Sequence, residues 1–228
     1  MLRNDVMADL ESWVEKGKDF VFEIRPKRTL RGIWHTLSKD RTALPDVPGW
    51  LIGKSLRTST IESELPWMCF SATRWLEKQV TTDSKVFEYG SGGSTLFWSA
   101  RVGQVVSIEH NALWYNKVKN TLVEKRQNVD YRLFEVEEGG STDSYVKSIK
   151  KENDGEFDIV VVDGIARVDC LREALPKVKK GGLLILDNSQ RDEYIKGINE
   201  LSMYQRWDFE GITPTTVMLP RTTAWKIT

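Results

Sequence analysis

The segment Val86–Thr95, which reads VFEYGSGGST, constrains the fold of this chain more than any other stretch. An apolar run ends in Glu88, two glycines flank a serine, and hydroxyl residues follow where a helix should begin. Gly90 and Gly92 can adopt positive φ and let the backbone approach a ligand closely. A parallel strand that feeds a helix through such a turn forms a nucleotide-cofactor site at the strand's carboxyl end. The segment therefore predicts an α/β fold with a ligand site at this turn.

The turn differs from the usual dinucleotide fingerprint G-x-G-x-x-G, because Thr95 stands in the place of the third glycine. Ser94 and Thr95 instead fit the start of a helix, where free N–H groups favour an anion. For the turn taken alone, an ordinary strand–turn–helix joint without a ligand is the alternative interpretation. The missing glycine argues against NAD as the ligand.

The acidic residue two positions before the first glycine completes the pattern E-x-G-x-G. This pattern resembles the first motif of the class I S-adenosylmethionine-dependent methyltransferases, and the stretch from about Thr81 to the end of the chain fits that family. The resemblance implies an enzyme whose glycine loop cradles the methionine part of S-adenosylmethionine. The cofactor-binding residues of the loop would be Glu88, Gly90, Ser91, Gly92, Ser94 and Thr95.

The composition indicates a globular protein. Of 228 residues, 40% are hydrophobic and 29% are charged, which predicts a substantial core and not disorder. Thirty-three basic residues balance thirty-three acidic ones, so the net charge does not favour nucleic acid or a membrane as a partner. Cys69 and Cys170 are far apart and outside metal-ligand spacing. With no signal-peptide pattern and no membrane-length apolar run, a cytoplasmic protein is expected.

Residues 1–80 and 81–228 differ in character. The first part lacks strand–helix alternation and is predicted as a helical, loop-rich extension that acts as a lid or shapes acceptor specificity. Its first helix is indicated by apolar residues at helical spacing around Leu10, and its second is expected to start at Pro66. Trp67 would be an aromatic lid that excludes water from the reaction, with packing in the core as the alternative.

Residues 81–228 are predicted as the methyltransferase core. Strands alternate with helical patterns, which predicts a Rossmann-like, doubly wound and mostly parallel sheet that ends in an antiparallel strand pair. Strands are expected over Val86–Tyr89, Val105–Glu109, Val129–Leu133, Phe157–Val162, Leu183–Leu186, Trp207–Ile212 and Thr222–Ile227.

Glu109 ends the second strand, 19 positions after Gly90. In a doubly wound sheet, an acidic residue at this distance accepts hydrogen bonds from ribose hydroxyls. The family resemblance implies the same role for Glu109 and an adenine-edge contact for His110, while a surface histidine at a helix start is the alternative. Glu135–Glu138 follows the third strand, but its alignment with the family's acidic adenine contact is not firm.

Asp163, Asp187 and Asn188 follow the fourth and fifth strands and would open at the same sheet edge as Glu88. These oxygen ligands suit Mg²⁺ or a similar cation. The trio resembles the metal site of the catechol and caffeoyl-coenzyme A O-methyltransferases, whose cation binds the acceptor hydroxyls. The alternative is that the aspartates cap the following helices.

The catechol enzymes place a catalytic lysine where this chain has Ala166. Arg167, which follows, is a poor proton acceptor, so if a base is needed, Asp163 itself or a metal-bound acceptor oxygen is the better candidate. Residues 163–169 also resemble a family of bacterial and viral methyltransferase-like proteins with the pattern D-G-x-x-R-x-D. Arg167 would there clamp an anionic or sugar acceptor, or else pair with Asp169 or a helix end. Asp163 and Arg167 are the catalytic candidates.

Basic residues gather between Arg25 and Arg41 around Trp34, a composition that can bind nucleic acid. The charge does not extend beyond this segment, so a solvated loop or an anionic acceptor site is favoured.

The sequence as a whole predicts an S-adenosylmethionine-dependent methyltransferase that modifies a hydroxyl of a small molecule or sugar, with a divalent cation as a candidate helper. Two alternatives stay open. One is another nucleotide-cofactor enzyme, such as an aminopropyltransferase or an NAD enzyme. The other is a non-catalytic module that binds a glycan or partner.

Overall fold

The computed structural model describes residues 59–214 and 220–228, without the side chains of residues 123 and 124, and a few separate residues between 30 and 50. The helix predicted around Leu10 and most of the basic segment Arg25–Arg41 lie outside the described residues.

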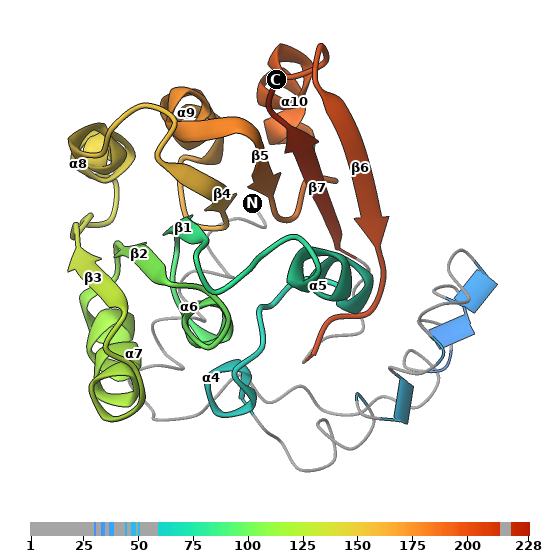
Figure 1. Ribbon diagram of the computed structural model, residues 1–228, viewed down its shortest axis with the longest axis horizontal. Helices are drawn as coiled ribbons and strands as arrows, with labels where there is room; N and C mark the ends of the chain where they lie inside the picture. The colour runs from blue at the N-terminus through green and yellow to red at the C-terminus, as the bar shows by residue number, and fades with distance from the viewer. Residues whose placement is uncertain are drawn as a thin grey trace.

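A seven-stranded sheet with the strand order β3-β2-β1-β4-β5-β7-β6 forms the centre of the protein (Figure 1). β7 pairs antiparallel with both β5 and β6, and the other neighbours pair parallel. The predicted mostly parallel, doubly wound sheet with an antiparallel C-terminal pair is therefore confirmed. The strands are β1 (Lys85–Tyr89), β2 (Gln104–Glu109), β3 (Val129–Leu133), β4 (Phe157–Val162), β5 (Val178–Leu186), β6 (Gln205–Glu210) and β7 (Arg221–Lys226).

Helices cover both faces of the sheet, with α5, α6 and α7 on one side and α8, α9 and α10 on the other (Figure 1). Among the described residues, none of the helices is long and apolar enough to cross a membrane. The α-helices are α4 (Thr60–Ser63), α5 (Phe70–Glu77), α6 (Gly93–Ser99), α7 (Ala112–Lys125), α8 (Asp143–Val146), α9 (Arg167–Ala174) and α10 (Ile195–Glu200).

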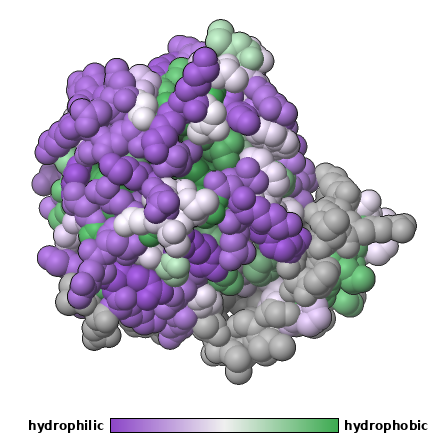
Figure 2. Space-filling view, viewed as in Figure 1, coloured by the Kyte–Doolittle hydropathy of each residue, from purple (hydrophilic) through white to green (hydrophobic). Residues whose placement is uncertain are grey.

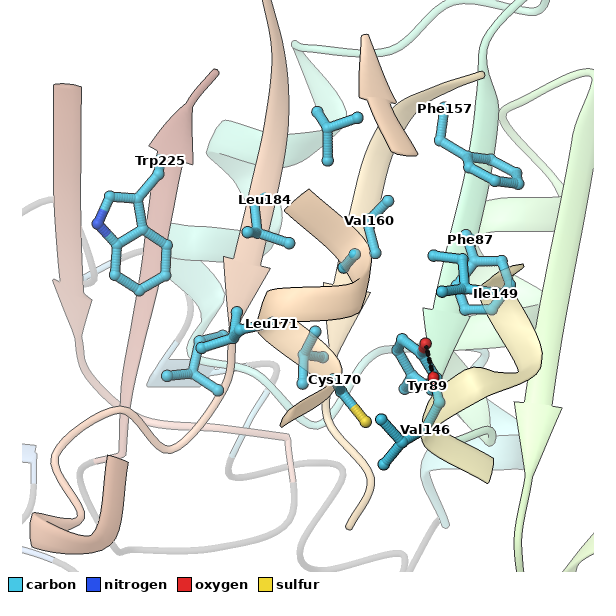
Figure 3. Packing of buried hydrophobic residues seen from close by; sticks show 14 of the residues in the cluster. Phe87, Tyr89, Val146, Ile149, Phe157, Val160, Cys170, Leu171, Leu184 and Trp225 are labelled. Carbon is cyan, nitrogen blue, oxygen red and sulfur yellow. Dashed lines mark hydrogen bonds between the residues drawn. The ribbon is translucent and has the colours of Figure 1, made fainter. Parts of the chain in front are cut away.

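Alternate residues of the central strands enter two different cores, because successive side chains of a strand point to opposite faces. Val86 packs with α5 and α6 on one face. Phe87 and Val160 belong to the core on the other face, which also contains Leu171 of α9 (Figure 3). Burial on both faces explains why β4 reads as an uninterrupted apolar run.

The helix predicted to start at Pro66 begins four residues later, so that prediction is wrong in its start. A short helix, α4, comes first, and a capping box between Ser59 and Glu62 forms its N-terminus. The N–H of Phe70, the first residue of α5, donates to the carbonyl of Ile212 at 3.1 Å, and Cys69 before it is extended. A contact with the distant end of the chain therefore determines where this helix starts.

The face of the molecule in Figure 2 is mostly hydrophilic, with small separate hydrophobic areas among the described residues. The apolar side chains lie mainly in the two cores, as expected for the composition of the chain.

Candidate cofactor and acceptor site

The turn between β1 and α6 brings its backbone against the end of β4. Gly90 has φ of 90°, and a Cβ built on it would lie 3.0 Å from the carbonyl carbon of Asp163 and from the nitrogen of Gly164. A side chain at position 90 would therefore be strained by the backbone conformation and crowded by backbone atoms. The close approach at this glycine is to the backbone that follows β4, while the approach to a ligand stays a prediction.

Glu88, at the end of β1, is buried beneath the turn. Thr95 donates its hydroxyl hydrogen to Glu88 Oε1, and Thr95 Oγ1 accepts the N–H of Gly92 at 3.1 Å. Burial raises the pKa of Glu88 to about 7, although the hydroxyls of Thr95, Ser107 and Ser94 beside it oppose the shift. Its second oxygen, Oε2, is buried with no hydrogen-bond partner among the described residues. This oxygen can therefore accept a hydrogen bond from a ligand beside the glycine turn.

Glu109, at the end of β2, is also buried but fully hydrogen-bonded. Its Oε2 accepts the N–H of Ser91 at 3.1 Å and the hydroxyl of Ser91 at 2.6 Å. Its Oε1 accepts the backbone N–H groups of His110 and Asn111, both at 2.9 Å. Burial alone would raise the pKa of Glu109, but the hydrogen bonds from His110, Ser91 and Asn111 outweigh it and lower the pKa. Glu109 is therefore an ionised acceptor at the predicted ribose position.

Two aromatic residues that the sequence placed only on element faces hold Ser91 in position. The indole nitrogen of Trp114 donates to the carbonyl oxygen of Ser91 at 2.8 Å. The hydroxyls of Ser91 and Tyr131 are 2.7 Å apart. The spacing of apolar residues in the sequence predicts the helix and the strand, but it contains no signal for these contacts across the turn.

A pocket of about 220 Å³ lies beyond the end of β2. It is lined by residues 110–113 on one side and by residues 135–138 on the other. His110 is one of the lining residues, and its Nδ1 lies 3.0 Å from Glu109 Oε1. The acidic run Glu135–Glu138, whose alignment the sequence left open, therefore faces the residues that follow Glu109.

Two carboxyl groups lie at the ends of β4 and β5. Asp187 is buried, and its Oδ1 accepts the hydroxyl hydrogen of Thr222 at 2.6 Å. Burial, followed by repulsion from Asp163, raises the pKa of Asp187 to about 7. Burial also raises the pKa of Asp163, against the attraction of Arg167. About a quarter of the Asp163 side chain (26%) is exposed, so Asp163 is the carboxyl that a substrate can reach.

The buried side chain of Arg167 joins the ends of β4 and β5 by hydrogen bonds. Its Nε donates to the carbonyl oxygen of Gly164 at 2.8 Å, and its Nη1 donates to the carbonyl oxygen of Asp187 at 2.6 Å. Its Nη2 donates to the carbonyl oxygen of Asp163 at 2.9 Å and lies 3.0 Å from Asp163 Oδ1. Only 8% of the side chain is exposed. The guanidinium therefore binds the protein's own backbone, an arrangement that the sequence did not predict.

The alternative partner that the sequence offered for Arg167 is engaged elsewhere. Asp169 Oδ1 lies 2.7 Å from a nitrogen of Arg172, on the exposed side of α9. Arg167 points the other way, toward the ends of β4 and β5, and Ala166 directly before it is in the left-handed conformation with φ of 47°.

The predicted metal ligands do not fit a divalent cation in this arrangement. Asp163 and Asn188 both face the Arg167 guanidinium, with Asn188 Oδ1 3.4 Å from Nη1, and Asp187 is engaged by Thr222. The guanidinium already occupies the side of Asp163 and Asn188 that a metal ion would need, and its permanent positive charge would oppose a second cation there. Within the described part of the chain, no group of three or more His, Cys, Asp or Glu side chains has the arrangement of a metal site.

Trp67 lies in the bend between α4 and α5, with 39% of its surface exposed. It is Met68, the next residue, that is buried among the residues of the core. Trp67 therefore does not occupy the fully packed position that the core alternative would give it.

No protein-family model matches the chain, and no curated protein matches it significantly. Solved structures match it at low sequence identity. They include an O-methyltransferase from Bacillus cereus in complex with SAH (16% identity, TM-score 0.53, 67% of this chain and 77% of that chain). An rRNA methylase from Streptococcus thermophilus has 11% identity and a TM-score of 0.53 over 68% of this chain and 94% of that chain. The precorrin 8w decarboxylase of Methanobacterium thermoautotrophicum has 20% identity and a TM-score of 0.51 over 69% and 88%.

At these identities the likeness concerns the fold alone. The chain has the Rossmann-like fold of these methyltransferases, in agreement with the fold class predicted from the sequence. What the site binds and which reaction it carries out must be argued from its own residues.

Proposed function

We propose that the chain is an S-adenosylmethionine-dependent methyltransferase that modifies a hydroxyl oxygen of a small molecule or saccharide. One observation carries this proposal. Two buried acidic residues, Glu88 and Glu109, flank the Gly90–Gly92 turn at neighbouring strand ends, and a pocket opens beyond Glu109. A nucleoside cofactor with a cationic end suits a site with this distribution of charge.

The donor half of the site offers a group for each part of such a cofactor. Glu109 is ionised and is held by backbone N–H groups, so ribose hydroxyls can donate to it once they displace or share the hydroxyl of Ser91. The pocket beside His110 suits a flat base. The unpartnered Oε2 of Glu88 is the acceptor for a donor group in the methionine part, such as its ammonium or a bridging water.

The acceptor half is built around Asp163. Bound S-adenosylmethionine supplies an electrophilic methyl group on its sulfonium. Asp163 is partly exposed and has a raised pKa, so its carboxylate can hold an acceptor hydroxyl and take its proton as the oxygen forms its bond to the methyl carbon. The carbon–sulfur bond breaks in the same step. Arg167 positions Asp163 through the backbone at the end of β4, and the alignment of donor and acceptor supplies most of the rate.

Calorimetric titration of the full chain with S-adenosylmethionine, S-adenosylhomocysteine and NAD tests the donor half. We expect binding of the first two and none of NAD. Glu109→Gln should weaken binding by about tenfold or more, because a charge-assisted hydrogen bond contributes about 1.5–3 kcal/mol. Glu156→Gln is the matched control, since Glu156 directly precedes β4 and pairs with Lys85 at the opposite edge of the sheet. Binding of NAD alone would sink the proposal.

Transfer of a labelled methyl group to a panel of phenols, polyols and sugars tests the acceptor half. Asp163→Asn should abolish transfer and leave the affinity for S-adenosylhomocysteine unchanged. Cofactor binding without transfer to any acceptor would favour the non-catalytic binding module.

A further inference from the structure

The hydroxyl of Tyr145 is a buried polar group to which the proposed chemistry gives no role. Tyr145 lies in α8 with none of its surface exposed, and its hydroxyl has no hydrogen-bond partner among the described residues. Burial raises the pKa of Tyr145, so the hydroxyl keeps its proton and remains a donor. A phenylalanine would fill the same space without the free-energy cost of an unpaired buried hydroxyl.

The hydroxyl faces the strand ends that enclose the donor half of the site. A Cβ built on Gly164, after β4, would lie 1.9 Å from the Tyr145 hydroxyl oxygen and 3.2 Å from the nitrogen of Gly90. The ring of Tyr145 also meets the ring of His110 edge-on, with centroids 5.7 Å apart. The hydroxyl therefore lies between the glycine turn, the end of β4 and the residue that follows Glu109.

We infer that Tyr145 is a cofactor-binding residue whose hydroxyl donates a hydrogen bond to the adenosyl part of the bound cofactor. The inference rests on the proposed function, which places the ribose at Glu109 and the base beside His110. The glycine at position 164 is consistent with this role of Tyr145, because any side chain at position 164 would occupy the place of the Tyr145 hydroxyl. Ribose oxygens and purine nitrogens supply the acceptor that the described residues do not provide to Tyr145.

The chain contains a matched control in Tyr89. Its ring lies 5.4 Å from that of Tyr145, and it is equally buried. Its hydroxyl donates to the carbonyl oxygen of Val146 at 2.6 Å, as the dashed line in Figure 3 shows. Among the described residues, the Tyr89 hydroxyl therefore has a hydrogen-bond partner and the Tyr145 hydroxyl has none.

The experiment compares the wild-type chain with Tyr145→Phe and Tyr89→Phe by calorimetric titration with S-adenosylhomocysteine and with adenosine. Tyr145→Phe should bind both ligands about tenfold more weakly, because it loses one hydrogen bond to the ligand. Its melting temperature without ligand should not fall, since the lost hydroxyl has no partner there. Tyr89→Phe should melt about 3 °C lower and bind both ligands as the wild type does.

Equal affinity of Tyr145→Phe and the wild type for S-adenosylhomocysteine would overturn the inference and leave the proposed function standing. A loss for S-adenosylhomocysteine without a loss for adenosine would overturn the assignment to the adenosyl part. If the wild type binds neither ligand, the proposed function itself fails, and this inference fails with it.

Discussion

Replacement of Arg167 by methionine tests whether this residue supports the strand ends or binds the acceptor. Methionine keeps much of the length of the side chain but removes all its hydrogen-bond donors. The carbonyl oxygens of Asp163, Gly164 and Asp187 lose the partner that joins them, and the Asp163 carboxylate loses its nearest cation. If Arg167 is structural, the loss should appear in the unfolding free energy of the protein without any ligand.

The expected loss follows from these contacts. Hydrogen bonds from a charged donor contribute about 1.5–3 kcal/mol each, but the three bonds share one guanidinium and do not add fully. Water can solvate part of the Asp163 carboxylate, which is partly exposed. Removal of one partner of a buried ion pair costs about 3–5 kcal/mol, and we expect a loss in this range. For a chain of this size, each kcal/mol lowers the melting temperature by about 2–4 °C.

Guanidinium denaturation followed by tryptophan fluorescence measures the loss. Arg172→Met is the matched control, because Arg172 lies on the same helix, is 40% exposed and pairs with Glu200 and Asp169 at the surface. Surface pairs contribute about 0–1 kcal/mol, so this variant should remain close to the wild type. An Arg167→Met protein as stable as Arg172→Met would refute the structural role. In that case the guanidinium would be free to bind an acceptor.

Two further predictions concern the buried carboxyls. Glu88 and Asp187 have pKa values raised to about 7, so the folded protein holds protons that the unfolded chain releases above about pH 4. The unfolding free energy should therefore fall as the pH rises from about 5 to 7. In a series of denaturation curves at different pH, Asp187→Asn should flatten this decline. An increase over the same interval would contradict the raised pKa values. Titration with Mn²⁺ followed by electron paramagnetic resonance should reveal no site that Asp187→Asn removes, because the Arg167 guanidinium, 3.0 Å from Asp163 Oδ1, already occupies the place of a cation. A stoichiometric site lost in that variant would show that the guanidinium leaves when a metal arrives.

The parts of the fold that the sequence predicts well are those with strong local patterns. β3 and β4 have the predicted bounds, since alternation marks the first and burial on both faces marks the second. The placement of Glu88 and Glu109 at neighbouring strand ends also follows from the sequence, because the acidic residues directly end two apolar runs of a parallel sheet.

The parts that the sequence did not predict depend on contacts between distant residues. The inward-pointing Arg167 follows an Ala166 in the left-handed conformation, which alanine rarely adopts and no residue pattern indicates. The Glu109–Ser91 hydrogen bonds and the orientation of Tyr145 join different strand ends across the turn. Local periodicity contains no information on these three arrangements, because their residues come together only in the folded chain.

The edge formed by Asp163, Asp187 and Asn188 illustrates why a ligand pattern alone does not define a metal site. The three oxygen-bearing side chains appear in the order and at the strand ends that a divalent cation would require. The positive group beside these three side chains determines how the edge can act. Here it is the guanidinium of Arg167, which stays charged at any working pH and does not dissociate from the protein. A bound metal exchanges with solvent and adds a site that can coordinate the acceptor directly. A buried arginine whose donors are occupied by backbone carbonyls can do neither. Under the proposed function, the partly exposed Asp163 is therefore the group that meets the acceptor. Arg167, which most resembles a catalytic clamp in the sequence, would then act on the acceptor only through Asp163.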